Sequence, residues 1–318
     1  MIWVSWRQQR TETLLAAVLL VLLAALFVPI GLHLSSLYDT EGVAACVGRR
    51  TDVCNQVLAT FGGHAGILRS VLGWLTLLPG LIGVALAAPV VLELENGSVS
   101  FGWTQGVTRL RWTATKLGVA VLSALLASGV LTLLLMFYRR ALDAVYGRMD
   151  SSVFDVEGIV PLAYVLFALG LGLAVGVVWR RTVPSVVVAF LGYIGGRLFV
   201  DSWLRQRLTT PLTATWGFHA QGPRLDKAWI LWQGPSDRAG HPFTAGPRVL
   251  QECVQDTGPG IKSVTEECLA RHGAGFNHAV YIPASHFWFL QAVEAALFAG
   301  VGLALIGFAT WWLLRRAE

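Results

Sequence analysis

The chain has 318 residues, of which 55% are hydrophobic and only 14% are charged, and its formal net charge is +5. Soluble domains carry about 25% charged residues, so this composition excludes ordinary water-soluble proteins. A bilayer core of about 30 Å is crossed by a helix of about 20 apolar residues. The chain is therefore best divided into membrane spans rather than into soluble domains.

Five apolar runs are long enough to cross a bilayer, and they cover residues 13–34, 71–92, 117–137, 159–179 and 288–314. A sixth run, 183–200, is shorter and contains Arg197, and we count it as a span as well. Backbone polar groups cannot face lipid unsatisfied, and these runs are too long for barrel strands, so we predict six helices. The first run exceeds the apolar part of a cleavable signal peptide and is kept as a span. The alternative is a set of buried helices in a large soluble protein.

The predicted fold is an all-α polytopic membrane protein. It has six transmembrane helices and a disulfide-stapled extracellular domain between the fifth and the sixth. We expect an interfacial elbow at 1–12, followed by helices one to five at 13–200. A cytoplasmic coupling segment at 93–116 lies within this part. The extracellular domain follows at 201–285, and the sixth helix with a cytoplasmic tail at 286–318.

Basic residues favour one orientation of these spans. Six spans place both termini on the same side, and short basic segments stay cytoplasmic. On the side assigned to the cytoplasm lie Arg7, Arg10, Arg109, Arg111, Lys116, Arg180, Arg181, Arg315 and Arg316. The opposite loops contain Arg49, Arg50, Arg139, Arg140 and Arg148, so the bias is not absolute. We predict a multi-pass protein of the cell membrane with both termini cytoplasmic.

The four cysteines all fall in loops assigned to the outside, where disulfides persist. Four cysteines allow three pairings. We favour Cys46 with Cys54 and Cys253 with Cys268, because pairing within one loop requires no long-range docking.

A zinc site is the alternative for the second cysteine pair, because His272 and His278 follow it at roughly finger-like spacing. The chain has no C-x-x-C pair, so we predict disulfides and no metal site. All seven histidines lie in the outer segments or at their membrane edge. We attribute this to the exclusion of histidine from apolar spans; pH sensing or metal collection is the alternative.

The long outer loop carries no convincing catalytic motif. Its basic and acidic residues nearly cancel, which argues against a nucleic-acid surface. The stretch "TGPGIKS" lacks the G-x-x-x-x-G-K spacing of a phosphate-binding loop. The outer loop as a whole contains neither a nucleophile elbow nor an H-E-x-x-H sequence. We therefore predict no catalytic residues and no cofactor bound by this chain.

The stretch between the second and third runs is more polar than a simple turn requires. Glu93 and Glu95 mark the exit from the membrane, and Asn96-Gly97 is a helix stop. Thr108 is a candidate N-cap of a short helix along the membrane surface. Its tryptophans, Trp103 and Trp112, would lie at headgroup depth, and its arginines, Arg109 and Arg111, would face water or a partner protein. A surface anchor without a partner is the simpler alternative.

This stretch, "ELENGSVSFGWTQGVTRLRWTATKLG", resembles the segment after the second span of ABC-2 type transporter permeases. In that family the segment reads as an acid, a Gly, a "W-T-Q" or similar, a Ser/Thr-Arg and a Lys entering the next span. The opening "MIWVSWRQQRTE" resembles the family's N-terminal elbow, especially in its actinobacterial members. The resemblance covers the membrane part, about three quarters of the chain.

The resemblance implies a permease subunit of an ABC exporter, half of a translocation pathway, whose segment between spans two and three docks on an ATPase. The chain has no nucleotide-binding motif, so a separate partner would bind ATP and Mg and hydrolyse the ATP. Two permease copies, most simply a homodimer, would pair in the lipid membrane. The implied coupling residues are Glu93, Glu95, Gly97, Trp103, Thr104, Gln105, Thr108, Arg109, Arg111, Trp112 and Lys116.

The outer loop is longer than is usual in that family, which puts the usual substrates (drugs, lipids, polysaccharides) in doubt. Two rival readings follow. The protein would be a membrane sensor or immunity protein that binds an external antimicrobial without transporting it, or a membrane-embedded enzyme that uses outer-loop residues.

Two charges fall inside the predicted spans. Arg197 lies near the outer end of the fifth run and Glu294 about two turns into the sixth. A charge at mid-bilayer costs at least about 2.5–3.5 kcal/mol, so such residues face a bundle interior or a cavity. We expect the two to face each other or a dimer cavity. The alternative is that Arg197 extends to the surface and Glu294 stays neutral.

Overall fold

The computed structural model describes residues 2–49, 51–64, 73–97, 108–225, 227–243, 249, 252–258, 261–264 and 266–316. The chain folds into two compact units. Met1–Arg205 together with Phe287–Glu318 forms the first, here called the helical unit, and Gln206–His286 forms the second, here called the sheet unit.

The described part of the helical unit has six helices that are long and apolar enough to cross a membrane. They are α1 (Ile2–Thr40), α5 (Leu78–Glu95), α7 (Arg109–Tyr146), α9 (Val160–Trp179), α10 (Thr182–Phe199) and α13 (Phe287–Arg316). Three short helices lie in the connections: α2 (Val43–Cys46), α3 (Asp52–His64) and α8 (Ser151–Phe154). The predicted fold class, six apolar helices with a disulfide between the fifth and the sixth, is confirmed.

Two of the helices extend well beyond the predicted spans. The first helix begins at residue 2 instead of 13, so the expected elbow at 1–12 is the beginning of α1. Helix α7 has 38 residues, where the prediction covered 117–137. Leaving the hydrocarbon does not end a helix, because its hydrogen bonds are internal. Helix α7 ends only at Gly147, whose φ of 75° is the left-handed conformation that favours glycine.

Helix α9 forms the centre of the helical unit and packs against α5, α7, α10 and α13. Glycines bring α9 and α13 close together: a Cβ added at Gly302 would lie 2.8 Å from the backbone of Leu166, and one at Gly170 would lie 2.6 Å from the Gly302 carbonyl oxygen. Small residues allow such close contact between membrane helices. By contrast, α1 and α10 expose large apolar side chains such as Leu14 and Val183, as lipid-facing helices do.

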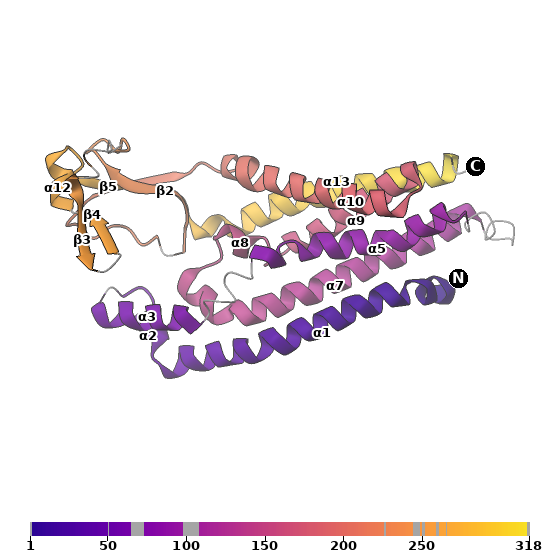
Figure 1. Ribbon diagram of the computed structural model, residues 1–318, viewed down its shortest axis with the longest axis horizontal. Helices are drawn as coiled ribbons and strands as arrows, with labels where there is room; N and C mark the ends of the chain where they lie inside the picture. The colour runs from indigo at the N-terminus through magenta and orange to yellow at the C-terminus, as the bar shows by residue number, and fades with distance from the viewer. Residues whose placement is uncertain are drawn as a thin grey trace. The chain divides into compact units, whose positions relative to one another are not determined.

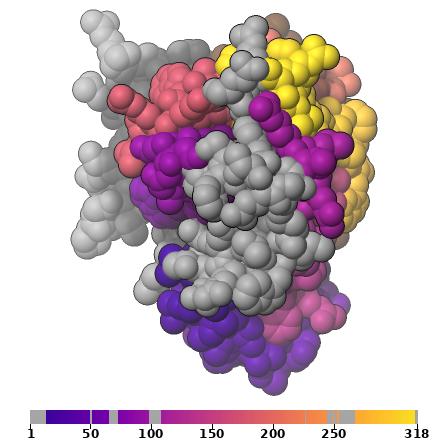
Figure 2. All heavy atoms as spheres, turned by 90° about the vertical axis from the view of Figure 1, so that its right-hand side faces the viewer, coloured from indigo at the N-terminus to yellow at the C-terminus, as the bar shows by residue number. Residues whose placement is uncertain are grey.

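The beginning of α1 and the end of α13 lie on the same side of the helical unit (Figure 1). Figure 2 views the molecule from this side, with part of α1 in indigo and part of α13 in yellow. The polar groups of other helix ends also meet here, since the Glu95 carboxylate at the end of α5 accepts a hydrogen bond from the backbone N–H of Thr182, the first residue of α10 (2.8 Å). We call this end the terminal end, and the other the distal end.

The sheet unit contains strands that the sequence analysis did not predict. Three antiparallel strands form a sheet in the order β1 (Leu212–Gly217), β5 (Phe276–Ile282) and β2 (Trp229–Ser236). Strands β3 (Val254–Gly258) and β4 (Ile261–Val264) form a hairpin, followed by helix α12 (Glu266–Arg271). The Cys253–Cys268 disulfide joins the residue before β3 to α12 and packs with Leu269 and Ala274 in a small core.

Candidate functional site

Buried charges of the helical unit converge on Arg205. The Arg205 side chain is 1% exposed, and its Nε and Nη2 donate to the two oxygens of Glu294 at 2.8 and 2.9 Å. Nη2 also donates to Asp155, and Nη1 donates to Asp201 at 2.7 Å. The Tyr164 hydroxyl donates to Glu294 and lies 3.1 Å from Asp155 Oδ1. We call this set the Arg205 network.

An irregular stretch of helix places Arg205 in the bundle. Helix α10 passes directly into a π-helix, Val200–Leu204, and then into a 3₁₀ turn, Arg205–Arg207. Asp201 lies in the π-helix, four residues before Arg205, and the two side chains form an ion pair. Single turns of π-helix are frequent at functional sites. The Arg205 guanidinium also lies over the Phe154 ring, 4.3 Å from its centroid.

Arg197 belongs to the same network but has a different partner from the one expected. Its Nε donates to Asp155 Oδ2 at 3.1 Å, and its Nη2 contacts the same oxygen. Glu294 is bound by Arg205 and Tyr164 instead. In the described residues, the expected direct contact between Arg197 and Glu294 is thus replaced by a chain through Asp155 and Arg205. Both expected residues lie in the bundle interior, as their charge requires.

A second buried cluster lies between the end of α7 and the start of α9. Arg139 Nη2 lies 2.9 Å from Asp143 Oδ1, and Arg139 Nε lies 2.9 Å from Glu157 Oε1. Arg148 Nε lies 3.3 Å from Asp143 and 3.5 Å from Glu157. The Asp143 and Glu157 side chains are 6% and 1% exposed. We call these four residues the Arg139 cluster; its formal charges sum to zero if both carboxyl groups are ionised.

Gln291 of α13 ties these connections to the start of α9. Its Oε1 accepts from the backbone N–H groups of Ile159 and Val160 at 3.0 and 3.1 Å, and its amide donates to the Phe154 carbonyl at 2.9 Å. The first N–H groups of a helix have no partner within it, so Gln291 supplies a cap from another helix. Gly158, with a φ of 72°, leaves room for this side chain.

The carboxylates expected to mark the coupling segment bind other helices of the bundle. Glu93 forms an ion pair with the buried Lys116 at the start of α7. The exposed Glu95 carboxylate accepts a hydrogen bond from the first backbone N–H of α10. Gly97 follows with a φ of 64°, as the predicted helix stop requires. These residues join the ends of α5, α7 and α10.

The predicted surface helix is, over its described part, the first turn of α7. Thr108 is its N-cap, as predicted: its hydroxyl accepts from the backbone N–H of Arg111 at 3.3 Å. Arg109 and Arg111 are exposed, whereas Trp112 is buried in the bundle. Trp103, Thr104 and Gln105 lie outside the described residues.

A family model matches the helical unit as far as Arg205. Residues 17–205 match the family model described as ABC-2 membrane transporter related, which is more than half of the chain. The chain belongs to this family. No curated protein and no solved structure matches it. The match confirms the resemblance seen in the sequence, and the ABC-2 chain is a multi-pass membrane protein and a membrane subunit of a transporter.

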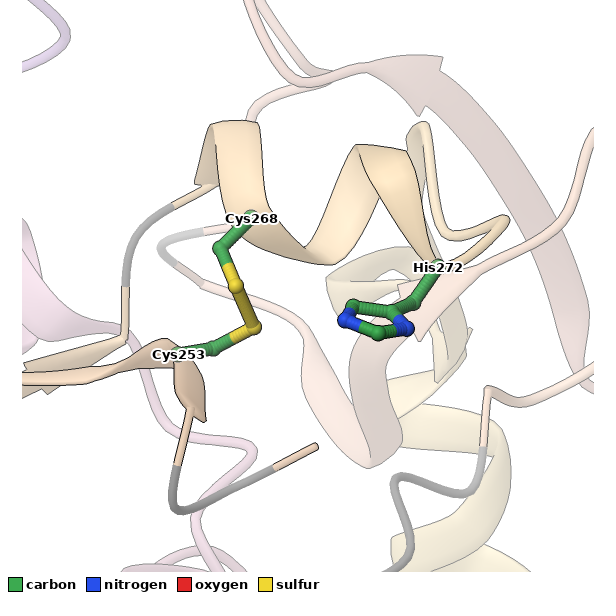
Figure 3. A group of neighbouring side chains, drawn as sticks. All are labelled: Cys253, Cys268 and His272. Carbon is green, nitrogen blue, oxygen red and sulfur yellow. A yellow bond between two sulfur atoms is a disulfide. The ribbon is translucent and has the colours of Figure 1, made fainter. Parts of the chain in front are cut away.

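This ABC-2 family member has both disulfides that the sequence predicted. Cys46 is joined to Cys54 in the connection after α1, and Cys253 to Cys268 in the sheet unit. The sulfurs of the second pair lie with His272 in a group whose ligand atoms are within 4.8 Å of one another (Figure 3). Metal binding by cysteine requires the thiolate, and the disulfide uses both sulfurs. His272 Nε2 instead faces Glu252 at 3.3 Å.

Sequence reasoning missed most of the Arg205 network. Arg205 was assigned to the outer domain, because the apolar run ends before it at residue 200, although the helix continues through irregular turns. Asp155 and Glu157 lie between two predicted spans and were not singled out, yet both are buried. Two carboxylates immediately before an apolar span are a signal that could have been used, since buried charges need partners.

Proposed function

We propose that the protein is the permease subunit of an ABC exporter that is driven by an ATPase on a separate chain. The observation that carries this is the family match over the first five membrane helices. In this proposal ATP and Mg bind to the partner ATPase, and two copies of the permease complete one translocation pathway. The family itself implies an ABC ATPase partner and a membrane environment.

Charge supports the terminal end as the cytoplasmic one. The described starts of α7 and α10 carry Arg109, Arg111 and Arg181 at this end. The basic residues of the distal end, which made the charge bias incomplete, are partly neutralised, because Arg139 and Arg148 are both paired with Asp143. Positively charged segments remain in the cytoplasm, so both termini are cytoplasmic in this proposal, in the cell membrane.

Side-chain exposure favours Arg109 and Arg111 within the proposed coupling segment. Glu93, Lys116 and Trp112 are engaged inside the bundle, whereas the Arg109 and Arg111 side chains are exposed in the first turn of α7. Helix α7 reaches from this turn to the Arg139 cluster at the distal end in 38 residues. A force applied by the ATPase at Arg109 and Arg111 would therefore act on a helix that runs from the terminal end to the distal end.

Charge reversal at both arginines tests the coupling. The Arg109→Glu/Arg111→Glu variant should reduce co-purification of the ATPase by about tenfold or more, since each 1.4 kcal/mol of lost contact is tenfold in binding. ATP hydrolysis should no longer drive transport. Arg140→Glu is the matched control, because Arg140 is an exposed arginine at the other end of the same helix. Unchanged co-purification together with unchanged transport would contradict the assignment.

Substrate-dependent ATP hydrolysis separates transport from sensing. If candidate external compounds stimulate the ATPase in reconstituted vesicles, the exporter proposal stands. Binding of such compounds without any change in hydrolysis would favour a sensor or immunity protein. Chemical turnover of the compound without an ATPase would indicate a membrane-embedded enzyme.

A further inference from the structure

The Arg139 cluster brings two buried carboxyl groups to the same pair of guanidinium groups. The Nε of Arg139 lies within 3.0 Å of oxygens of both Asp143 and Glu157, and the Nε of Arg148 lies within 3.5 Å of both. Two carboxyl groups that share their partners at these distances repel each other when both are ionised. Repulsion of this kind favours a proton on one of them, as in carboxyl pairs at catalytic sites.

The hydrogen-bond donors of the cluster favour one of the two carboxyl groups. Arg139 Nε donates to Asp143 Oδ1 at 3.0 Å, and Arg148 Nε donates to Asp143 Oδ2 at 3.3 Å. Glu157 is 1% exposed, and its two oxygens accept no hydrogen bond from the described residues. The 2.9 Å approach of Arg139 Nε to Glu157 is thus close in distance but not aligned as a hydrogen bond.

An ionised carboxylate without donors is costly in the protein interior, whereas a neutral carboxylic acid carries its own donor. We propose that Asp143 and Glu157 form a proton-binding site, in which Glu157 holds the proton and Asp143 stays ionised. On binding, a proton from water adds to a Glu157 oxygen; on release, it returns to water and Glu157 becomes the second negative charge between the two arginines. Charge balances at each stage.

The electrostatics of Glu157 agree with this geometry. Burial raises the pKa of Glu157 to about 8, the negative charge of Asp143 adds to the increase, and the positive charges of Arg139 and Arg148 oppose it. These three residues are the charged groups that face Glu157 in the described part of the chain. Glu157 lies between two spans, and Arg148 is 40% exposed, which gives the site an edge from which water can exchange protons.

Infrared spectroscopy of the purified full-length protein in lipid tests the site. Ordinary glutamic and aspartic acids are ionised above about pH 6, so a carboxylic-acid C=O band that persists at neutral pH reports an anomalous group. We expect one such band in the wild type, lost as the pH rises through about 8. Absence of any protonated carboxyl band above about pH 6 would overturn the proposal without any variant.

Variants assign the band. Glu157→Gln should remove it, and Glu41→Gln, which changes an exposed glutamate, should leave it unchanged. Arg148→Gln should shift the loss of the band upward by about one pH unit or less, because it removes a partly exposed positive charge that favours ionisation. A band that survives Glu157→Gln would place the proton elsewhere and refute the assignment.

A stability titration provides a second readout for the same site. The pKa of Glu157 is higher in the folded protein than the ordinary value of 4.5. The stabilising contribution of its protonated form is therefore complete below about pH 4.5 and is lost as the pH rises through about 8. The stability of Glu157→Gln relative to the wild type should rise over this window. A flat difference would contradict the proposal.

Discussion

At the residue scale, Arg205 shows what a buried charge needs. Its guanidinium group contacts three carboxylates, Asp155, Asp201 and Glu294, and it lies over the phenyl ring of Phe154. A buried ion pair gains little over an apolar replacement, but removal of one partner leaves the other charge uncompensated. The network is therefore sensitive to single substitutions and more tolerant of paired ones.

The Arg205 network makes a prediction that distinguishes the observed partners from those expected from sequence. Arg205→Gln and Glu294→Gln should each destabilise the folded protein by about 3–5 kcal/mol, and the double variant should cost clearly less than their sum. Chemical unfolding in mixed micelles measures the three values. The pair Arg197→Gln/Glu294→Gln serves as the control and should be closer to additive, because Arg197 binds Asp155 instead. Equal coupling in both cycles would contradict the geometry.

At the element scale, the crossing of α9 and α13 depends on missing side chains. Gly302 is buried against the backbone of Leu166 and Phe167, while Gly300 on the same helix is exposed with no atom within 4 Å of an added Cβ. An alanine in a helix interior is normally better than glycine by about 0.5–1 kcal/mol. The two positions therefore differ in packing alone.

Alanine at these two glycines should have opposite effects. Gly300→Ala should leave stability unchanged or raise it slightly. Gly302→Ala should lower it by about 1–3 kcal/mol, because the added methyl group would have to separate α9 from α13. Thermal unfolding in the same detergent compares the two variants directly. If Gly302→Ala were as stable as Gly300→Ala, the close approach of the two helices would be wrong.

The helices themselves could be predicted from sequence, but their ends and partners could not. Apolar length gives five spans and a shorter sixth, because the bilayer imposes a minimum length on each, and the structure has all six. It does not give the end of a helix: α10 continues through a π-turn to Arg205, although the residues after 200 read as a polar loop. Nor does apolar length give contacts between distant residues. Arg197 was paired with Glu294 because the two were expected at a similar depth in the membrane. In the structure, Arg197 binds Asp155, which in turn binds Arg205, the partner of Glu294. The disulfides were predictable because their cysteines lie close in sequence.

At the scale of the whole molecule, the sheet unit is an insertion between α10 and α13. The family match ends at residue 205, the last residue of the first part of the helical unit, and the sheet unit begins at Gln206. The sheet unit has its own strands, disulfide and small core. The helical unit keeps both buried charge networks within itself. We therefore expect each unit to retain its fold when the other is perturbed.

Removal of one disulfide tests this independence. Cys253→Ser/Cys268→Ser opens a loop with a sequence separation of 15, which should destabilise the sheet unit by about 3 kcal/mol. Limited proteolysis should then cut within 206–286 and spare the membrane helices, because the core around the lost bond consists of a few side chains such as Leu269 and Ala274. Cys46→Ser/Cys54→Ser is the matched control and should leave the sheet unit resistant. Proteolysis that reaches the helical unit at the same rate in the Cys253→Ser/Cys268→Ser variant would show that the two units unfold together, and the Arg205 network would then depend on the sheet unit that follows it in the chain.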